Sequence, residues 1–396
     1  MRDAVIVEAV RTPIGKARRG AYPEVHPVEL HAHALRSLIA RVPGLDPVEI
    51  DDVIGGAVGQ VGEQSTNTTR LAALAAGFPE SVPGVTVDRQ CGSSQQALSF
   101  AAQGLIAAAY DIVVASGVES MSRVPIGSSA LVDGARADVA GPGVAARYPG
   151  GLIPQGVSAE LIARKWGLSR LQLDEYAATS HQRAAEAWRQ GHFDSQVAPL
   201  PGIEVARDET IRPGTTVDRL AELPPAFAAA HWSTRFGEID WKVTAGNSSP
   251  LNDGSAALLL TTSDTARRHG WRPRARIHTA TVVGDDPILM LTGIIPATAR
   301  VLARAGLTLA DIDAFEVNEA FSSVVLAWLV ETGADPAKVN VDGGAIALGH
   351  PLGASGARLA TTLLHVLERT GGRYGLQTMC EAGGTANATI IERLDA

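Results

Sequence analysis

Both cysteines of this 396-residue chain stand where a β-type run meets a glycine. Cys91 follows "VTVDRQ" and precedes the helical stretch "GSSQQALSFAAQGLIAAA". A cysteine at a helix start lies near unpaired N–H groups and the positive end of the helix dipole, which favours the nucleophilic thiolate. A free cysteine is also a common small core residue, so position alone leaves nucleophile and core filler both open.

Cys380 occupies a similar junction near the other end of the chain, in "LQTMCEAGG". We expect it to end a strand and enter a glycine-containing turn. A second thiol beside the first can donate a proton to one reactant and accept one from another. Taken alone, the position favours a core residue.

His350 is the histidine with the most unusual surroundings, the glycine-rich stretch "GGAIALGHPLGASGAR". Glycines let the backbone approach a ligand closely, and Pro351 suits a first helical turn. Imidazole near neutral pH is the natural base to take the proton of a cysteine. Such a turn fixes the ring, which favours a catalytic over a structural histidine.

Asn318, in "EVNEAF", stands with Glu319 at an expected strand end among apolar residues. Its amide can orient a water or donate to an oxyanion; an ordinary turn asparagine is the alternative. The three histidines of "HPVELHAHALR", by contrast, have no carboxylate or cysteine at zinc spacing. We therefore predict no metal site and place them on a solvated helix face.

The bulk composition indicates a folded protein of two or three domains, with 45% hydrophobic and 19% charged residues. A net charge of -8 argues against a nucleic-acid partner. No apolar run reaches the roughly 18 residues of a membrane span, and the N-terminus does not resemble a signal peptide. Two cysteines without such a signal predict a reducing, cytoplasmic setting and no structural disulfide.

Short β-type runs alternate with alanine-rich helical runs, a pattern typical of βαβ units around a parallel sheet. The alternation breaks between about 123 and 245, where we expect an inserted loop domain, and resumes at "RARIHTATVVGD". The expected strands of the first part are 3–10, 51–58, 85–90 and 111–117.

The chain also repeats itself. The stretch 44–57 is echoed by 306–320, and the stretch around Cys91 is echoed by the one that carries His350 and Cys380. The separation stays near 254–263 positions, which indicates one β/α fold present twice. Duplicated halves can bring residues far apart in sequence to one shared cleft.

Together, "CGSS", "NEAF", "GHPLGASG" and "MCEAGG" make the sequence resemble the thiolases over essentially its whole length. "VRTPIGK", "GVESMS" and "TAGNSSPLNDGSAAL" belong to the same pattern. The resemblance implies an α/β fold of duplicated βαβαβαββ halves in a layered α-β-α-β-α core with an inserted loop domain. The implied domains are 1–122 plus 246–269, the CoA-binding insertion 123–245, and 270–396.

The resemblance implies thiolytic cleavage of a 3-oxoacyl-CoA. Cys91 would attack the ketone carbon, forming an acyl-enzyme and releasing acetyl-CoA or propionyl-CoA, while His350 activates it. Cys380 would protonate the departing enolate and then deprotonate the incoming CoA. A water on Asn318 would complete one oxyanion hole, and the backbone N–H groups of Cys91 and Ala382 would form a second.

Ser249 and Phe321 match family positions near CoA. Coenzyme A is then a substrate, with no permanently bound cofactor and no metal. The partners are acyl-CoA and CoA, without nucleic acid or membrane, and a homodimer or homotetramer is implied.

Four positions depart from the family pattern. Ala382 replaces the usual glycine two residues after the second cysteine, which affects the second oxyanion hole. Pro154 and Gln155 replace a histidine and a methionine of many short-chain members, which favours a longer or bulkier acyl group. Ser94 stands where glycine is common. The match is strongest to degradative thiolases of actinobacterial type, including those acting on steroid-derived acyl-CoA thioesters.

Three alternatives remain. One is a biosynthetic acetoacetyl-CoA thiolase. Another is a ketoacyl-synthase-like condensing enzyme, but such enzymes lack a second catalytic cysteine, so Cys380 argues against it. The third is a non-catalytic acyl-CoA-binding relative, which the full set of cysteines, histidine and asparagine disfavours and Ala382 weakly favours.

Overall fold

One mixed β-sheet links the two halves of the chain in the computed structural model, which describes residues 2–394. Its strand order is β10-β11-β12-β9-β1-β8-β5-β3-β4, and the short β2 (Gly15–Lys16) pairs with β8. Between the named strands of residues 2–394, parallel pairing is confined to β3 with β4, β3 with β5, and β10 with β11. The β/α alternation indicated a parallel sheet; the sheet is mixed, because its middle strands pair antiparallel.

The expected strands of the first half are present, with small differences at their ends. The run that precedes Cys91 ends as a strand at Val87, three residues earlier than predicted. The strands and helices of this half are β1 (Val5–Arg11), α1 (Pro27–Ala40), β3 (Asp52–Gly56), α2 (Thr68–Ala75), β4 (Gly84–Val87), α3 (Ser93–Ile106), β5 (Ile112–Ser120), β8 (Asn252–Thr261) and α9 (Ser263–His269).

The second half repeats this order of elements. Short 3-10 turns at Pro47–Glu49 and Leu309–Asp311 precede β3 and β10, as the sequence repeat predicts. The elements of this half are β9 (Ala275–Gly284), α10 (Ile294–Ala305), β10 (Ala314–Val317), α11 (Ser322–Thr332), α12 (Ala345–Leu348), α13 (Leu352–Thr370), β11 (Tyr374–Glu381) and β12 (Thr385–Arg393).

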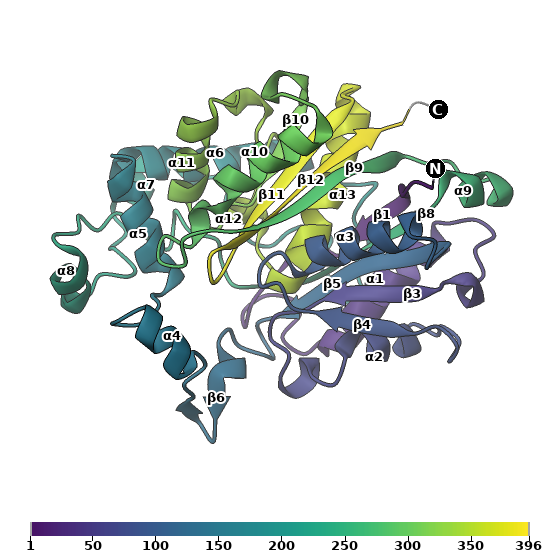
Figure 1. Ribbon diagram of the computed structural model, residues 1–396, viewed down its shortest axis with the longest axis horizontal. Helices are drawn as coiled ribbons and strands as arrows, with labels where there is room; N and C mark the ends of the chain where they lie inside the picture. Colours follow the sequence, from purple (N-terminus) through teal and green to yellow (C-terminus); the bar gives the residue numbers. More distant parts are fainter. Residues whose placement is uncertain (1, 395–396) are drawn as a thin grey trace.

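Helices α3 and α13 are the equivalent helices of the two halves and pack against each other in the middle of the molecule (Figure 1). Most of α13 is buried on every side, as expected of a helix in a central layer. A Cβ at Gly356 would lie 2.2 Å from Gln95 N, so only glycine permits this close approach. Ser94 Oγ accepts a hydrogen bond from Ala357 N at 2.9 Å, which ties the two helix starts together.

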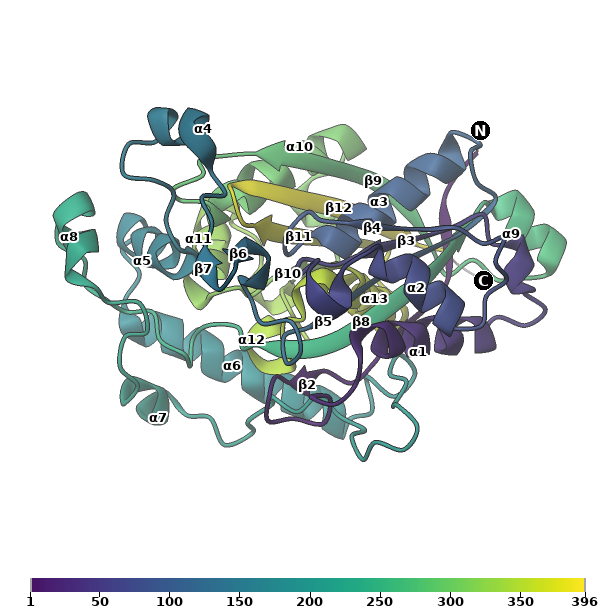
Figure 2. The same cartoon turned by 90° about the horizontal axis from the view of Figure 1, so that it is seen from below.

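The segment 123–245 forms a β-hairpin and five helices at one side of the molecule (Figures 1 and 2). Its longer helices α5 and α6 pack on α11 and α12 of the second half. A fully buried ion pair between Arg11 and Asp208 joins the segment to β1. Its elements are β6 (Leu131–Val132), β7 (Ala135–Arg136), α4 (Gly141–Arg147), α5 (Gln155–Lys165), α6 (Arg170–Arg189), α7 (Val217–Ala221) and α8 (Ala230–Phe236).

Among residues 2–394, no helix combines the length and apolar character that crossing a membrane would require.

Candidate active site

Cys91 lies in a tight turn between β4 and α3. Gln90 adopts a left-handed conformation with φ +50°, and Ser93 N donates to its carbonyl at 3.0 Å. Gly92 N donates to Arg89 O at 3.1 Å, and Ser93 Oγ accepts from Arg89 N at 2.9 Å. These local bonds fix the backbone of the turn, so the position of the thiol is set before any ligand binds.

The Cys91 side chain is packed between the two halves and is 3% exposed. Its apolar neighbours are Leu352 and Leu359 of α13 and Met379 of β11. Leu352 begins the helix that follows His350, and Met379 precedes Cys380. The duplicated fold therefore brings the first cysteine to the elements that carry the other predicted site residues.

His350 lies two residues after the end of α12, and hydrogen bonds hold both its backbone and its ring. Its backbone N–H donates to Asn252 Oδ1 at 2.9 Å, and its Nδ1 lies 2.6 Å from Ser355 Oγ. The Ser355 hydroxyl donates to Pro351 O at 2.8 Å, so it accepts from an Nδ1–H of the ring. The proton thus sits on Nδ1, and Nε2 presents a lone pair.

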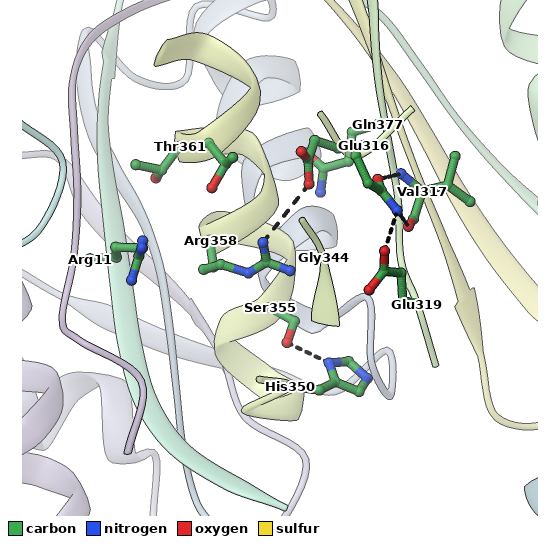
Figure 3. Close-up of polar contacts among 12 residues, drawn as sticks. Arg11, Glu316, Val317, Glu319, Gly344, His350, Ser355, Arg358, Thr361 and Gln377 are labelled. Carbon is green, nitrogen blue, oxygen red and sulfur yellow. Dashed lines mark hydrogen bonds and ion pairs between the residues drawn. The ribbon is translucent and has the colours of Figure 1, made fainter. Parts of the chain in front are cut away.

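Burial, and to a smaller extent the positive charge of Arg358, lower the pKa of His350 to about 3. Figure 3 shows His350, Ser355 and Arg358 following one another along the start of α13. Arg358 is itself buried, and its nearest carboxylate is that of Glu316 at 3.8 Å. The ring is consequently neutral at physiological pH, the state required of a base.

Asn318 connects His350 to Cys380. It follows β10, and its Nδ2 lies 3.4 Å from His350 Nε2. The same side chain hydrogen-bonds to the Cys380 thiol, which lowers the pKa of that thiol. Its buried Oδ1 has no hydrogen-bond partner within residues 2–394, so an acceptor remains available at the centre of the site.

Both thiols are protonated in this state, contrary to the thiolate expected for Cys91 from its helix start. Burial raises the pKa of Cys91 well above its usual value, and Cys380, Glu381 and Glu119 raise it further. Burial, then Glu381, raises the pKa of Cys380 to about 12. Because the helix begins two residues after Cys91, desolvation outweighs the helix dipole.

Ala382 lies in the three-residue turn between β11 and β12, half-buried against the core of the second half. Its backbone is outside the left-handed region, whereas Gly383 and Gly384 both have positive φ. An alanine therefore fits position 382 without backbone strain.

Ser249 and Phe321 lie close together. Ser249 N donates to Ala320 O at 3.0 Å, and Ser248 forms a β-bridge with Phe321. The Phe321 ring packs edge-on against Phe227 of the inserted segment, with centroids 6.0 Å apart.

The two polar residues of "EVNEAF" differ in their surroundings. The Glu319 carboxylate accepts hydrogen bonds from Tyr176, Ser180, Asn340 and the backbone of Ile346. Through these four hydrogen bonds, the Glu319 carboxylate joins the inserted segment to the second half. The adjacent Asn318 keeps a free acceptor and belongs to the site.

Ser355, Asn252 and Glu381 were not predicted from the sequence. The position of Ser355 in "GHPLGASG", one helical turn after Pro351, was a usable signal. Glu381 also carried one, because a charged residue seldom ends a buried strand. Asn252 carried none, since only the antiparallel strand β8 brings it to His350.

The histidines of α1 correct another prediction. His31 is fully buried, and its Nε2 lies 2.8 Å from Ser116 Oγ of β5, so this helix face is not solvated. Burial lowers the pKa of His31 to about 3. Among the described residues, no group of histidine, cysteine, aspartate and glutamate is arranged to hold a metal ion.

Comparison with known proteins places this chain in a family. The description "Thiolase, N-terminal domain" matches residues 4–264, and "Thiolase, C-terminal domain" matches residues 271–393. The chain belongs to the thiolase family, and it is an acyltransferase of that family.

Individual relatives match the whole chain. A "Steroid 3-ketoacyl-CoA thiolase FadA6" of Mycobacterium tuberculosis is 49% identical over 406 residues, covering 100% of this chain and 95% of the relative. A "3-ketoacyl-CoA thiolase" of Erwinia tasmaniensis is 43% identical, covering 100% of both. The crystal structure of the Bacillus anthracis acetyl-CoA acetyltransferase superposes with a TM-score of 0.88 at 39% identity, covering 100% of this chain and 99% of that one.

Proposed function

We propose that this enzyme cleaves 3-oxoacyl-CoA thioesters with CoA, giving acetyl-CoA or propionyl-CoA and a shortened acyl-CoA. The convergence of Cys91, His350 and Cys380, with Asn318 between the last two, is the observation that carries the proposal. Relatives named as 3-ketoacyl-CoA thiolases support the same substrate class.

In the first half-reaction, Cys91 Sγ attacks the ketone carbon of the substrate, and its proton passes to His350 Nε2. The bond between the second and third acyl carbons breaks, leaving an acyl thioester on Cys91. The enolate of the departing CoA ester takes a proton from Cys380 and leaves as acetyl-CoA or propionyl-CoA. Because the resting thiol and imidazole are both neutral, proton transfer is favoured only as the substrate oxyanion develops and is stabilised.

Two groups of donors would stabilise the oxyanions. A water bound to the free Oδ1 of Asn318, together with His350, would serve the tetrahedral centre or enolate. The backbone N–H groups of Cys91 and Ala382 would serve the other oxygen. Loss of one such donor costs roughly a hundredfold or more in rate.

In the second half-reaction, CoA replaces the released product. The Cys380 thiolate takes the proton of the CoA thiol, whose sulfur attacks the thioester on Cys91. The shortened acyl-CoA leaves, and the proton held on His350 returns to Cys91. Both cysteines then carry protons again, so the cycle is closed.

We propose that the acyl group is longer or bulkier than acetoacetyl, including steroid-derived chains. Pro154 caps α5 and Gln155 begins it, in place of the histidine and methionine of many short-chain members. The 49% identity to a relative named as a steroid thiolase supports this choice over a biosynthetic acetoacetyl-CoA thiolase.

The binding of CoA is assigned to the inserted segment 123–245, with Ser249 and Phe321 beside the pantetheine. The division into 1–122 plus 246–269, 123–245 and 270–396 is part of the same proposal. The contact between Phe321 and Phe227 of the insertion supports it.

The two free cysteines suit a reducing, cytoplasmic setting.

We also propose a homodimer or homotetramer. β4 ends the sheet, pairs with β3 alone among the described strands, and leaves Val85 43% exposed. An open strand edge of this kind can pair with a second copy of the chain. Light scattering at micromolar concentration tests this, and a monomer would refute it.

The activity is tested with acetoacetyl-CoA and a series of longer 3-oxoacyl-CoA thioesters. We expect CoA-dependent loss of the 3-oxoacyl absorbance, with acetyl-CoA or propionyl-CoA and a shortened acyl-CoA identified by mass. kcat/KM should rise from acetoacetyl-CoA to the bulkier substrates. No cleavage of any of them would refute the function, and a preference for acetoacetyl-CoA would refute the assigned acyl group.

A further inference from the structure

A buried carboxylate lies beside both cysteines. Glu381 ends β11 directly after Cys380 and is fully buried. Its Oε1 accepts a hydrogen bond from Asn387 Nδ2 at 2.6 Å, and its Oε2 accepts one from Thr385 Oγ1 at 2.8 Å. Both partners come from β12, so the side chain is fixed by the neighbouring strand.

The same carboxylate touches the turn that carries Cys91. A Cβ at Gly92 would lie 1.8 Å from Glu381 Oε1, so the carboxylate occupies the space that a side chain at position 92 would need. Gly92 has φ -88° and needs no glycine for its backbone conformation. Glycine is required here because Glu381 is present.

This contact places a negative charge next to two thiols in a desolvated site, where Coulomb interactions are strong. Burial raises the pKa of both thiols the most, and the charge of Glu381 adds to the increase because it disfavours a second negative charge nearby. Burial raises the pKa of Glu381 itself to about 7, while hydrogen bonds from Thr385 and Asn387 and the charge of Arg89 oppose that rise.

The other titratable and charged groups around Cys91 do not cancel the increase in its pKa that Glu381 causes. Glu119 also raises the pKa of Cys91, and His350 is neutral. Arg89, on the turn of Cys91, favours the charged form of Glu381 and partly offsets the effect of burial on its pKa. Thr385 and Asn387 of β12 are uncharged.

We propose that Glu381 is a positioning residue whose charge, once the carboxyl is ionised, adds to burial in keeping Cys91 and Cys380 in the thiol form until substrate is bound. The proposal rests on the nucleophilic role of Cys91 proposed above. In the resting enzyme the proton stays on Cys91 Sγ, and it moves to His350 Nε2 only with the substrate oxyanion in place. Glu381 takes no proton from either thiol; it acts through its charge.

The test is the rate at which iodoacetamide alkylates Cys91, because only the thiolate reacts and the reagent is uncharged. Peptide mass spectrometry separates Cys91 from Cys380. In the wild type, the logarithm of the rate should rise with pH, flatten near pH 7 as Glu381 ionises, and rise again. The flattening follows because ionised Glu381 makes the thiol a weaker acid.

Glu381→Gln keeps the size and the acceptor of the side chain but removes its charge. We expect equal alkylation rates at about pH 5.5, no flattening, and a rate about tenfold higher at about pH 8.5, equivalent to one pKa unit. Glu381→Asp is the matched control, because it keeps the charge and changes the packing. The alkylation profile of Glu381→Asp should keep the flattening near pH 7 and should lack the tenfold higher rate at about pH 8.5.

Thr385→Val gives a second test that leaves Glu381 in place. Losing a hydrogen bond that stabilises the charged form raises the pKa of Glu381, so the flattening should move to higher pH. A Glu381→Gln profile parallel to the wild type, a Glu381→Asp profile that accelerates like Glu381→Gln, or an unmoved flattening in Thr385→Val would each overturn the proposal.

A different result would refute the proposed function. If a 3-oxoacyl-CoA leaves no acyl group on wild-type Cys91, the nucleophilic role is wrong whatever the alkylation profiles show. If the acyl group forms and the profiles of wild type and Glu381→Gln coincide, only the role of Glu381 is wrong.

Discussion

The turn of Cys91 and the turn of His350 are equivalent positions in the two halves, and they hold their side chains differently. Each precedes a central helix, α3 or α13, and each has a glycine beside the functional residue, Gly92 or Gly349. His350 is fixed through its backbone and both ring nitrogens, by Asn252, Ser355 and Asn318. Cys91 is fixed through the backbone of its turn and through apolar packing of its side chain.

The difference matches the tasks of the two groups. A base must present one nitrogen in one tautomer, which hydrogen bonds to the other nitrogen can ensure. A nucleophile must move toward the substrate carbon, and a sulfur without strong hydrogen bonds loses none when it does. The duplicated fold thus supplies two similar turns, and the local hydrogen bonds make one a base and the other a nucleophile.

Removing the base should have the largest effect. We predict that His350→Asn lowers kcat by about a thousandfold or more, because general base catalysis contributes that order of rate. Steady-state cleavage of a 3-oxoacyl-CoA measures it. An activity within tenfold of the wild type would contradict the assignment of His350.

The second thiol should matter for one half-reaction more than for the other. We predict that Cys380→Ser slows carbon–carbon cleavage by about a hundredfold or more, yet still acylates Cys91 slowly from a simple acyl-CoA. Parallel assays of cleavage and of acyl transfer from an unbranched acyl-CoA separate the two. Normal cleavage by Cys380→Ser would refute the two-cysteine mechanism.

The hydroxyl that orients the imidazole should have a smaller effect. Ser355→Ala removes the partner of His350 Nδ1, so we expect kcat to fall about tenfold, in line with one lost hydrogen bond of about 1.4 kcal/mol. Ser355→Thr, which keeps the hydroxyl, is the matched variant. Equal losses in both variants would indicate packing rather than orientation.

The least effect on activity is expected at His31, the buried histidine of the first half. Its folded-state pKa of about 3 lies below its ordinary value of 6.5, so the unfolded chain binds a proton that the folded chain does not. Its contribution to stability is therefore complete above pH 6.5 and is lost as the pH falls toward 3.

His31→Gln should consequently reduce the pH dependence of the free energy of unfolding by about 1.4 kcal/mol per pH unit in that window. Denaturant titrations at several pH values measure this slope, and turnover near pH 8 should stay close to that of the wild type. An unchanged slope would show that His31 is not buried in the neutral form.

Much of this arrangement could be predicted from the sequence, because it depends on local patterns. The β/α alternation and the internal repeat indicated a duplicated β/α fold, and the resemblance to thiolases implied the roles of Cys91, His350 and Cys380. The protonation state of Cys91 could not be predicted, because it depends on burial of the thiol between the two halves. The repeat shows that these halves are some 260 positions apart in the sequence.

The partners of the site residues were also hidden for a physical reason. Asn252 reaches His350 only through an antiparallel strand, and Glu381 reaches Gly92 only through contact between the halves. Alternating patterns in a sequence specify elements, but they do not specify which elements become neighbours. The prediction that His31 lies on a solvated helix face was wrong for the same reason, since its partner Ser116 lies on β5.

The nucleophilic role of Cys91 is tested most directly by locating the acyl group on the enzyme. Wild type and Cys91→Ala are incubated briefly with a 3-oxoacyl-CoA that the enzyme cleaves, without added CoA, and analysed by intact mass and peptide mapping. We predict one acyl group on Cys91 of the wild type, its removal by CoA, and none on Cys91→Ala. Cleavage with the acyl group on Cys380, or an acylated Cys91→Ala, would contradict the account.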